Sequence, residues 1–182
     1  MTPIEYTQLN AFARVDGIRL AVVWTASFAC YVASFSWPVM SLLALLPVLA
    51  TPLLMGRMAA CYAMVATGGK ASLRRRYLYC MTLFFYAALL FALVQWLYFA
   101  YIDQGDMLRW IEQTAATPDG QQALQAYGLD KDFGPTMEML RSLRPIDLAL
   151  NILSTNLLLG LLVSLLAVFF SRRAPQVDRR KP

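Results

Sequence analysis

The sequence predicts an all-α membrane protein with four transmembrane helices and an outer amphipathic helical insert. Hydrophobic residues make up 59% of the 182 residues and charged residues only 15%, which is low for a soluble domain. The hydrophobic residues gather in long blocks, as membrane-spanning helices require. Positive charge is concentrated in the loop 56–76 and acidic charge in the segment 103–145, so the two sides of the membrane differ in charge.

Residues 1–19 are interpreted as an amphipathic cytoplasmic N-terminus. Tyr6, Leu9 and Phe12 have the spacing of a short helix that lies on the membrane surface. A cleaved signal peptide is not expected, because this segment contains the acids Glu5 and Asp16 and has no excess of positive charge.

The first three membrane spans are expected within residues 20–102. The first span, about 20–37, is uncharged and leads through a very short turn into the second, about 39–55. Pro47 and Pro52 lie inside the second span, where each removes a backbone donor and favours a kink.

The loop 56–76 between the second and third spans has no acidic residue, which predicts a cytoplasmic turn. Alanines favour continuation of the second helix to Ala66, and Gly68-Gly69 is expected to end it. The third span, about 77–102, has aromatic residues at both ends, as is typical of the two headgroup levels. The basic residues of the loop are Arg57, Lys70, Arg74, Arg75 and Arg76.

Residues 103–145 form the one long polar segment and are predicted to lie outside. Two amphipathic pieces are expected in it, over 107–116 and 135–143. About 40 residues bury little core alone, so this insert should rest on the outer membrane surface or cap the bundle.

The fourth span is expected over 146–170, and a basic cytoplasmic tail follows over 171–182. Asp147, Asn151 and Thr155 recur every four residues, which predicts a polar intramembrane stripe along one helix face. We expect this stripe to face protein, either as a contact that holds helices together or as a small polar site.

The distribution of basic residues sets the predicted topology. Twelve of the sixteen lie in segments assigned to the inner side, which places both termini in the cytoplasm. The four on the outer side are Arg109, Lys131, Arg141 and Arg144.

The residue types argue against catalysis, a metal site or a cofactor. The chain has no histidine, the commonest general base and metal ligand. Cys30, Cys61 and Cys80 lie in or beside apolar runs without metal-type spacing, so they are interpreted as packing residues. Asp130-Lys131-Asp132 lacks the pattern of a calcium loop and is interpreted as a solvated turn. The protein is therefore not expected to be an enzyme.

The connection from Arg57 through Gly68-Gly69-Lys70 to Leu73-Arg74, with its flanking spans, resembles domain-of-unknown-function family 4199. This is a family of uncharacterised four-span bacterial inner-membrane proteins, and the similarity covers most of the chain. The resemblance implies a multi-pass protein of the bacterial inner membrane, with residues 103–145 in the periplasm. The family has no established activity. Its members are often encoded near a membrane glycosyltransferase that uses a polyprenyl-phosphate carrier, which implies such an enzyme as a partner.

The function favoured by these features is that of a non-catalytic accessory or scaffold subunit, which binds a partner membrane protein, or a second copy of itself, together with anionic lipid. The basic residues could bind lipid phosphate or a partner, or could serve only to orient the chain; nucleic acid is not expected. The alternative is a small transporter or channel-like protein, but the predicted first span lacks an ionisable residue and the two halves do not match. The expected binding residues are Arg57, Lys70, Arg74, Arg75, Arg76, Arg172 and Arg173.

Overall fold

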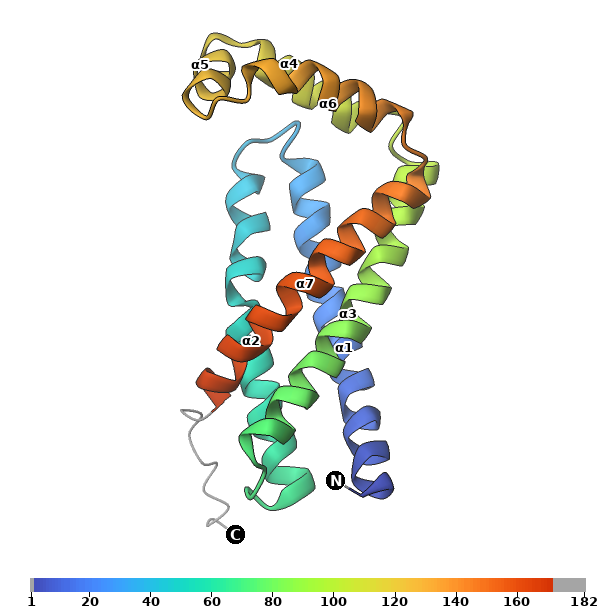
Figure 1. Cartoon of the computed structure of the whole chain (residues 1–182), viewed down its shortest axis with the longest axis vertical. Coiled ribbons are helices and arrows are strands. Elements are labelled where there is room, and N and C mark those ends of the chain that lie inside the picture. Colours follow the sequence, from blue (N-terminus) through green and yellow to red (C-terminus); the bar gives the residue numbers. More distant parts are fainter. Residues whose placement is uncertain (1, 172–182) are drawn as a thin grey trace. The chain divides into compact units, whose positions relative to one another are not determined.

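The computed structural model describes residues 2–171, and in that part of the chain all regular secondary structure is helical, which confirms the all-α class. Four of the helices, α1, α2, α3 and α7, are long and apolar enough to cross a membrane (Figure 1). In chain order the helices are α1 (Pro3–Ala33), α2 (Met40–Thr67), α3 (Leu73–Tyr101), α4 (Asp106–Ala116), α5 (Pro118–Ala126), α6 (Asp130–Ser142) and α7 (Pro145–Ser171).

The helices group into two compact units. Unit 1 contains the described residues 2–91 and 153–171, and unit 2 contains residues 92–152. Unit 1 therefore holds α1, α2, most of α3 and most of α7. Unit 2 holds the polar insert together with the helix ends that lead into and out of it.

Helix α1 is continuous from Pro3 to Ala33, whereas the sequence predicted a separate surface helix over 1–19. Its start is fixed by a capping box, in which Glu5 N donates to Thr2 Oγ1 at 3.3 Å and Thr2 N donates to Glu5 Oε2 at 2.9 Å. No proline follows Pro3 in this segment, so nothing interrupts the helix before the apolar span begins.

The predicted boundaries of the other spans are close to the observed ones. Helix α2 continues through both of its prolines and ends at Thr67, where Gly68 takes a left-handed conformation with φ 58°. Gly69 N then donates to Ala63 O at 2.9 Å, which confirms the glycine pair as the helix stop. Helix α3 begins four residues before its predicted span, and α7 extends the predicted 146–170 by one residue at each end.

Two glycines of unit 1 lie where helices approach each other closely. A Cβ atom at Gly17 of α1 would lie 2.8 Å from Tyr86 Cβ of α3. A Cβ atom at Gly56 of α2 would lie 2.8 Å from Ala167 O of α7. In a lipid environment such small residues let helix backbones pack directly, so these contacts set the spacing of the bundle.

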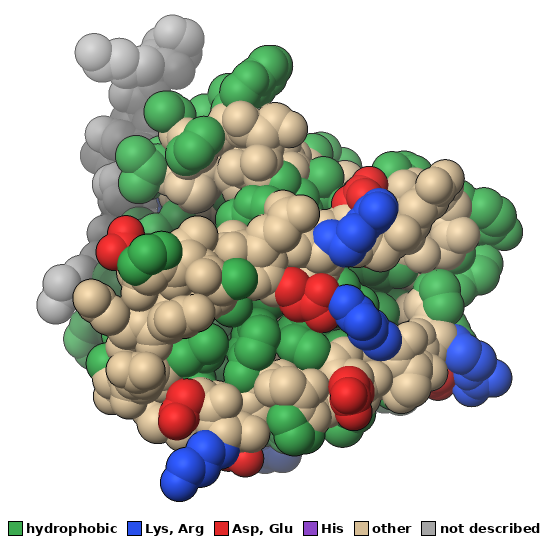
Figure 2. Space-filling model, turned by 90° about the horizontal axis from the view of Figure 1, so that it is seen from above, with side chains coloured by type: hydrophobic (Ala, Val, Ile, Leu, Met, Phe, Trp, Pro, Cys, Tyr) green, Lys and Arg blue, Asp and Glu red, His purple; other side chains and the backbone are tan. Residues whose placement is uncertain are grey.

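Unit 2 contains three insert helices rather than the two predicted pieces. Thr117 separates α4 from α5 and caps α5, because its Oγ1 accepts from Gly120 N at 3.1 Å. Pro135 lies inside α6 rather than at its start. An ion pair of 2.5 Å between Arg141 and Glu112 joins α6 to α4. Figure 2 shows acidic and basic side chains lying near one another on this polar part of the molecule.

The contact at Gly56 predicts a specific loss of stability. The added Cβ of Gly56→Ala meets the backbone of α7, so we expect the free energy of unfolding in detergent to fall by about 1–3 kcal/mol. The control is Gly134→Ala in α6, whose Cβ would meet nothing within 4 Å and should leave stability unchanged or slightly raised. Equal thermal stability of Gly56→Ala and the parent protein would show that α2 and α7 do not approach in this way.

The topology can be tested with two matched substitutions, Gln8→Cys in α1 and Gln122→Cys in α5, after replacement of the native cysteines. Both glutamines are exposed. Because most basic residues flank the ends of the spans that are predicted to lie inside, a membrane-impermeant thiol reagent added outside should label position 122 and leave position 8 unlabelled. Labelling of position 8 alone from outside would reverse the predicted orientation.

Candidate functional site

A buried acid organises the inner end of unit 1, defined here as the end that carries the connection between α2 and α3. Asp16 of α1 is 8% exposed, although α1 is long and apolar enough to cross a membrane. Its Oδ1 accepts a hydrogen bond from Arg19 at 2.8 Å, and its Oδ2 accepts one from the Tyr79 hydroxyl of α3. Both carboxylate oxygens therefore have partners, which is the condition under which a charge can be buried.

Two stacked tyrosines extend this interaction to α2. The rings of Tyr79 and Tyr62 lie parallel, with centroids 4.4 Å apart and an interplanar angle of 3°, and both side chains are fully buried. The Tyr62 hydroxyl accepts from Arg75 Nε at 3.0 Å, and Arg75 NH1 pairs with Glu5 at 2.9 Å. The path from Asp16 to Glu5 thus ties α1, α2 and α3 together, and we call it the inner network.

Sequence reasoning missed Asp16, although a signal for it exists. Leu9, Ala13, Asp16 and Leu20 are all buried and recur at helical spacing, so the acid belongs to the core-facing side of α1. The prediction that residues 1–19 lie on the membrane surface places this acid in solvent rather than between helices.

Arg76 is also held by the fold. Its NH1 donates to Ser171 O at 3.0 Å, at the carboxyl end of α7, where backbone carbonyls lack helical partners. The start of α3 and the end of α7 therefore lie side by side at the inner end, as expected if they are antiparallel neighbours. Arg172 and Arg173 lie outside the described residues.

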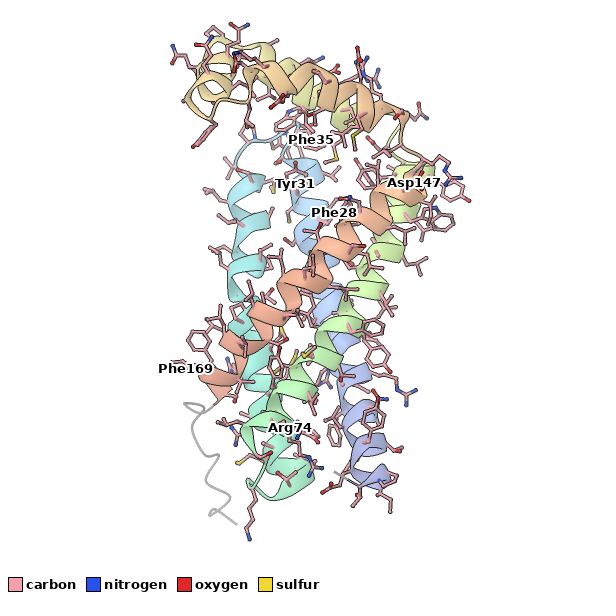
Figure 3. The ribbon with its side chains drawn as sticks, in the orientation of Figure 1. Phe28, Tyr31, Phe35, Arg74, Asp147 and Phe169 are labelled. Carbon is pink, nitrogen blue, oxygen red and sulfur yellow. The ribbon has the colours of Figure 1, made fainter. Side chains whose placement is uncertain are left out.

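The other three predicted binding residues have no such role. Arg57, Lys70 and Arg74 are exposed, and their side chains make no hydrogen bond or ion pair with residues 2–171. Figure 3 shows Arg74 near the start of α3, at the end of unit 1 opposite to Phe28. The five described residues of the predicted binding set thus divide into Arg75 and Arg76, which hold helices together, and three whose side chains are unpaired.

Two clefts border the inner network. One has a volume of about 470 Å³ between α1 and α2, and its lining includes Asp16, Arg19 and Arg57. The other, of about 360 Å³, is lined in part by Glu5, Arg74 and Arg75. The free arginines are therefore distributed over two separate concave surfaces.

Two residues of the polar stripe predicted on α7 are exposed in the part of the chain that the structure describes. Asn151 and Thr155 are exposed, and Asp147 forms a local ion pair with Arg144 at 2.9 Å. The face of α7 that packs within unit 1 is a different one, made of small residues at helical spacing. That face consists of Gly160, Ser164, Ala167 and Ser171.

An apolar cavity of about 600 Å³ lies in unit 1, away from the basic residues. Trp24, Phe84 and Phe91 line it, together with Asn156 of α7. Trp24 Nε1 donates to Thr51 Oγ1 at 3.0 Å, so this indole nitrogen is satisfied within the protein. No group of three or more Cys, Asp or Glu side chains within residues 2–171 is arranged to hold a metal ion.

These features define a multi-pass, all-α membrane protein whose inner end carries both structural and unpaired arginines. The model of the family described as "Protein of unknown function (DUF4199)" matches residues 16–173. The chain belongs to this family, which confirms the resemblance found in the sequence. Comparison of the chain with curated proteins and with solved structures finds no match.

Adjacent arginines provide a matched test of the inner network. Arg75→Gln removes the guanidinium that joins Tyr62 to Glu5, so we expect the free energy of unfolding in detergent to fall by about 1–3 kcal/mol. Arg74→Gln removes the same charge from the preceding position and should change the free energy of unfolding by less than about 0.5 kcal/mol. If both variants lose the same stability, the effect comes from net charge rather than from the network.

Proposed function

We propose that the protein is a non-catalytic accessory or scaffold subunit, which binds anionic membrane lipid and a partner membrane protein through its inner basic surface. The observation that carries this proposal is the division of the basic residues. Arg75 and Arg76 are used by the fold, whereas Arg57, Lys70 and Arg74 remain unpaired within residues 2–171. Unpaired cations at a headgroup level are available to a ligand.

Phosphate is the ligand chemistry that best matches these cations. A basic residue near an anionic membrane surface contributes about 1 kcal/mol to binding. The guanidinium fork also matches two phosphate oxygens, which strengthens and orients the contact. An orientation signal requires positive charge on the inner side, but it does not require a concave surface such as those at Arg57 and Arg74.

Exposed polar residues on α7 support the partner part of the proposal. Asn151 and Thr155 are exposed in the isolated chain, and contact with hydrocarbon is unfavourable for them. A helix of another protein, or of a second copy, would supply hydrogen-bond partners. The family resemblance makes a polyprenyl-phosphate glycosyltransferase the proposed partner class.

Asp16 is the feature that favours the alternative of a small transporter, because transporters commonly use a membrane-embedded acid. Its surroundings favour a structural role instead. Each of its oxygens accepts a hydrogen bond, one from Arg19 and one from Tyr79, as expected of an acid that holds two helices together. We therefore retain the accessory role as the proposal.

The proposal predicts the behaviour of the variant Arg57→Gln/Lys70→Gln/Arg74→Gln. Three unpaired charges are lost while nine remain on the inner side, so folding and orientation should persist. Native mass spectrometry in mild detergent should show several-fold less bound anionic phospholipid, and a co-purifying partner should be reduced in a tagged pull-down.

The control removes the same number of charges from the insert, as Arg109→Gln/Lys131→Gln/Arg144→Gln. It should retain lipid and partner at parental levels, because these residues belong to unit 2 and the predicted outer side. If the inner variant keeps its topology and retains lipid and partner at the level of the parent protein, the basic residues serve only to orient the chain and the proposal is rejected.

A further inference from the structure

The cleft between α1 and α2 differs from the other cavities of unit 1 in combining an unpaired cation with several apolar lining residues. Its volume, about 470 Å³, lies in the range of roughly 300–1,000 Å³ that is usual for small-ligand sites. Arg19 and Arg57 contribute guanidinium groups, and Phe12, Val15 and Met58 contribute apolar surface. The 600 Å³ cavity has no charged lining residue, and the 360 Å³ cleft also holds arginines and one acid but has Leu78 as its only apolar lining residue.

The charge balance of the cleft favours an anion. Asp16 is its one acid, and both of that carboxylate's oxygens already accept hydrogen bonds from Arg19 and Tyr79. The Arg19 side chain is nevertheless 68% exposed, which leaves donors of its guanidinium facing solvent. The Arg57 side chain has no polar partner in residues 2–171, so the cleft holds one uncompensated cation beside a second, partly engaged one.

The position of the cleft along the bundle suits a lipid headgroup. Gly56 lies against Ala167 and Phe170, in the last turns of α7, and Arg57 is the next residue of α2. The two arginines are therefore close to the level at which the apolar part of α7 ends. An amphiphile with a phosphate at this level and a chain extending into hydrocarbon matches both the charge and the apolar walls.

We propose that the α1–α2 cleft is a specific site for an anionic phospholipid, with the headgroup phosphate between Arg19 and Arg57 and the start of an acyl chain against Phe12, Val15 and Met58. This inference rests on the proposed lipid-binding function and deepens it. It assigns Arg19, which the sequence did not indicate, and moves the main lipid contact from the Arg74–Arg76 triplet to the first two helices.

The test compares two unpaired arginines of equal charge. Purified protein is titrated with phosphatidylglycerol or phosphatidylcholine, and bound lipid is counted by native mass spectrometry. Arg57→Gln should weaken phosphatidylglycerol binding by about fivefold, which corresponds to the roughly 1 kcal/mol of one cation at an anionic surface. Arg74→Gln, which lies outside this cleft, should weaken binding by a clearly smaller factor than Arg57→Gln, and phosphatidylcholine binding should be weak in all three proteins.

A second pair of variants keeps every charge. One variant fills the cleft, and the other adds the same side chain outside it. Cys61 lines the cleft and is exposed, so Cys61→Trp should fill it and weaken phosphatidylglycerol binding by a similar factor. Met64, also exposed on α2, does not line the cleft, and Met64→Trp should bind like the parent. Inorganic phosphate at millimolar concentration should not displace the lipid, because it lacks the acyl contacts; displacement would identify a free-phosphate site instead and overturn the proposal.

The outcomes separate this inference from the broader function. Equal losses for Arg57→Gln and Arg74→Gln, with no effect of Cys61→Trp, would overturn the cleft site and leave a diffuse basic surface. If the variant lacking Arg57, Lys70 and Arg74 retains all of its anionic lipid, both the cleft site and the proposed function are rejected.

Discussion

The inner end of this bundle depends on the burial of one carboxylate. Asp16 is nearly inaccessible in a helix that is long and apolar enough to cross a membrane, so its charge requires partners within the protein. Arg19 supplies one from the next turn of α1, and Tyr79 supplies the other from α3. The position of α3 against α1 is therefore constrained by chemistry as well as by packing. The close approach of α3 at Gly17, one residue beyond the acid, is the steric counterpart of this constraint.

The same constraint determines which basic residues are available to a ligand. Because Tyr79 is anchored on Asp16 and stacked on Tyr62, the Tyr62 hydroxyl is placed where Arg75 donates to it. Arg75 is consequently held between α2 and α1, while its neighbour Arg74 remains exposed. A run of three arginines that looks uniform in the sequence thus contains residues with different roles.

The sequence predicted the elements better than their partners. Apolar blocks and basic loops indicate spans and orientation because both are properties of a single segment, and α2, α3 and α7 begin and end close to the expected residues. The faces of the helices were harder to predict, because a polar period such as Asp147–Asn151–Thr155 does not reveal which side another helix covers. The face of α7 that packs against other helices of unit 1 consists of small residues instead. Likewise, Asp16 and Tyr79 are 63 residues apart in the sequence, so the spacing of residues within one helix cannot predict their contact.

A double-mutant cycle on Asp16→Asn and Tyr79→Phe tests the central claim most directly. Unfolding of the parent, the two single variants and the double variant in the same detergent gives the coupling free energy between the two side chains. A direct, buried hydrogen bond to a charged group predicts a coupling of at least about 1 kcal/mol, with the double variant less destabilised than the sum of the single variants. Strict additivity of the two substitutions would show that the carboxylate and the hydroxyl do not interact, and would contradict the account of the inner network.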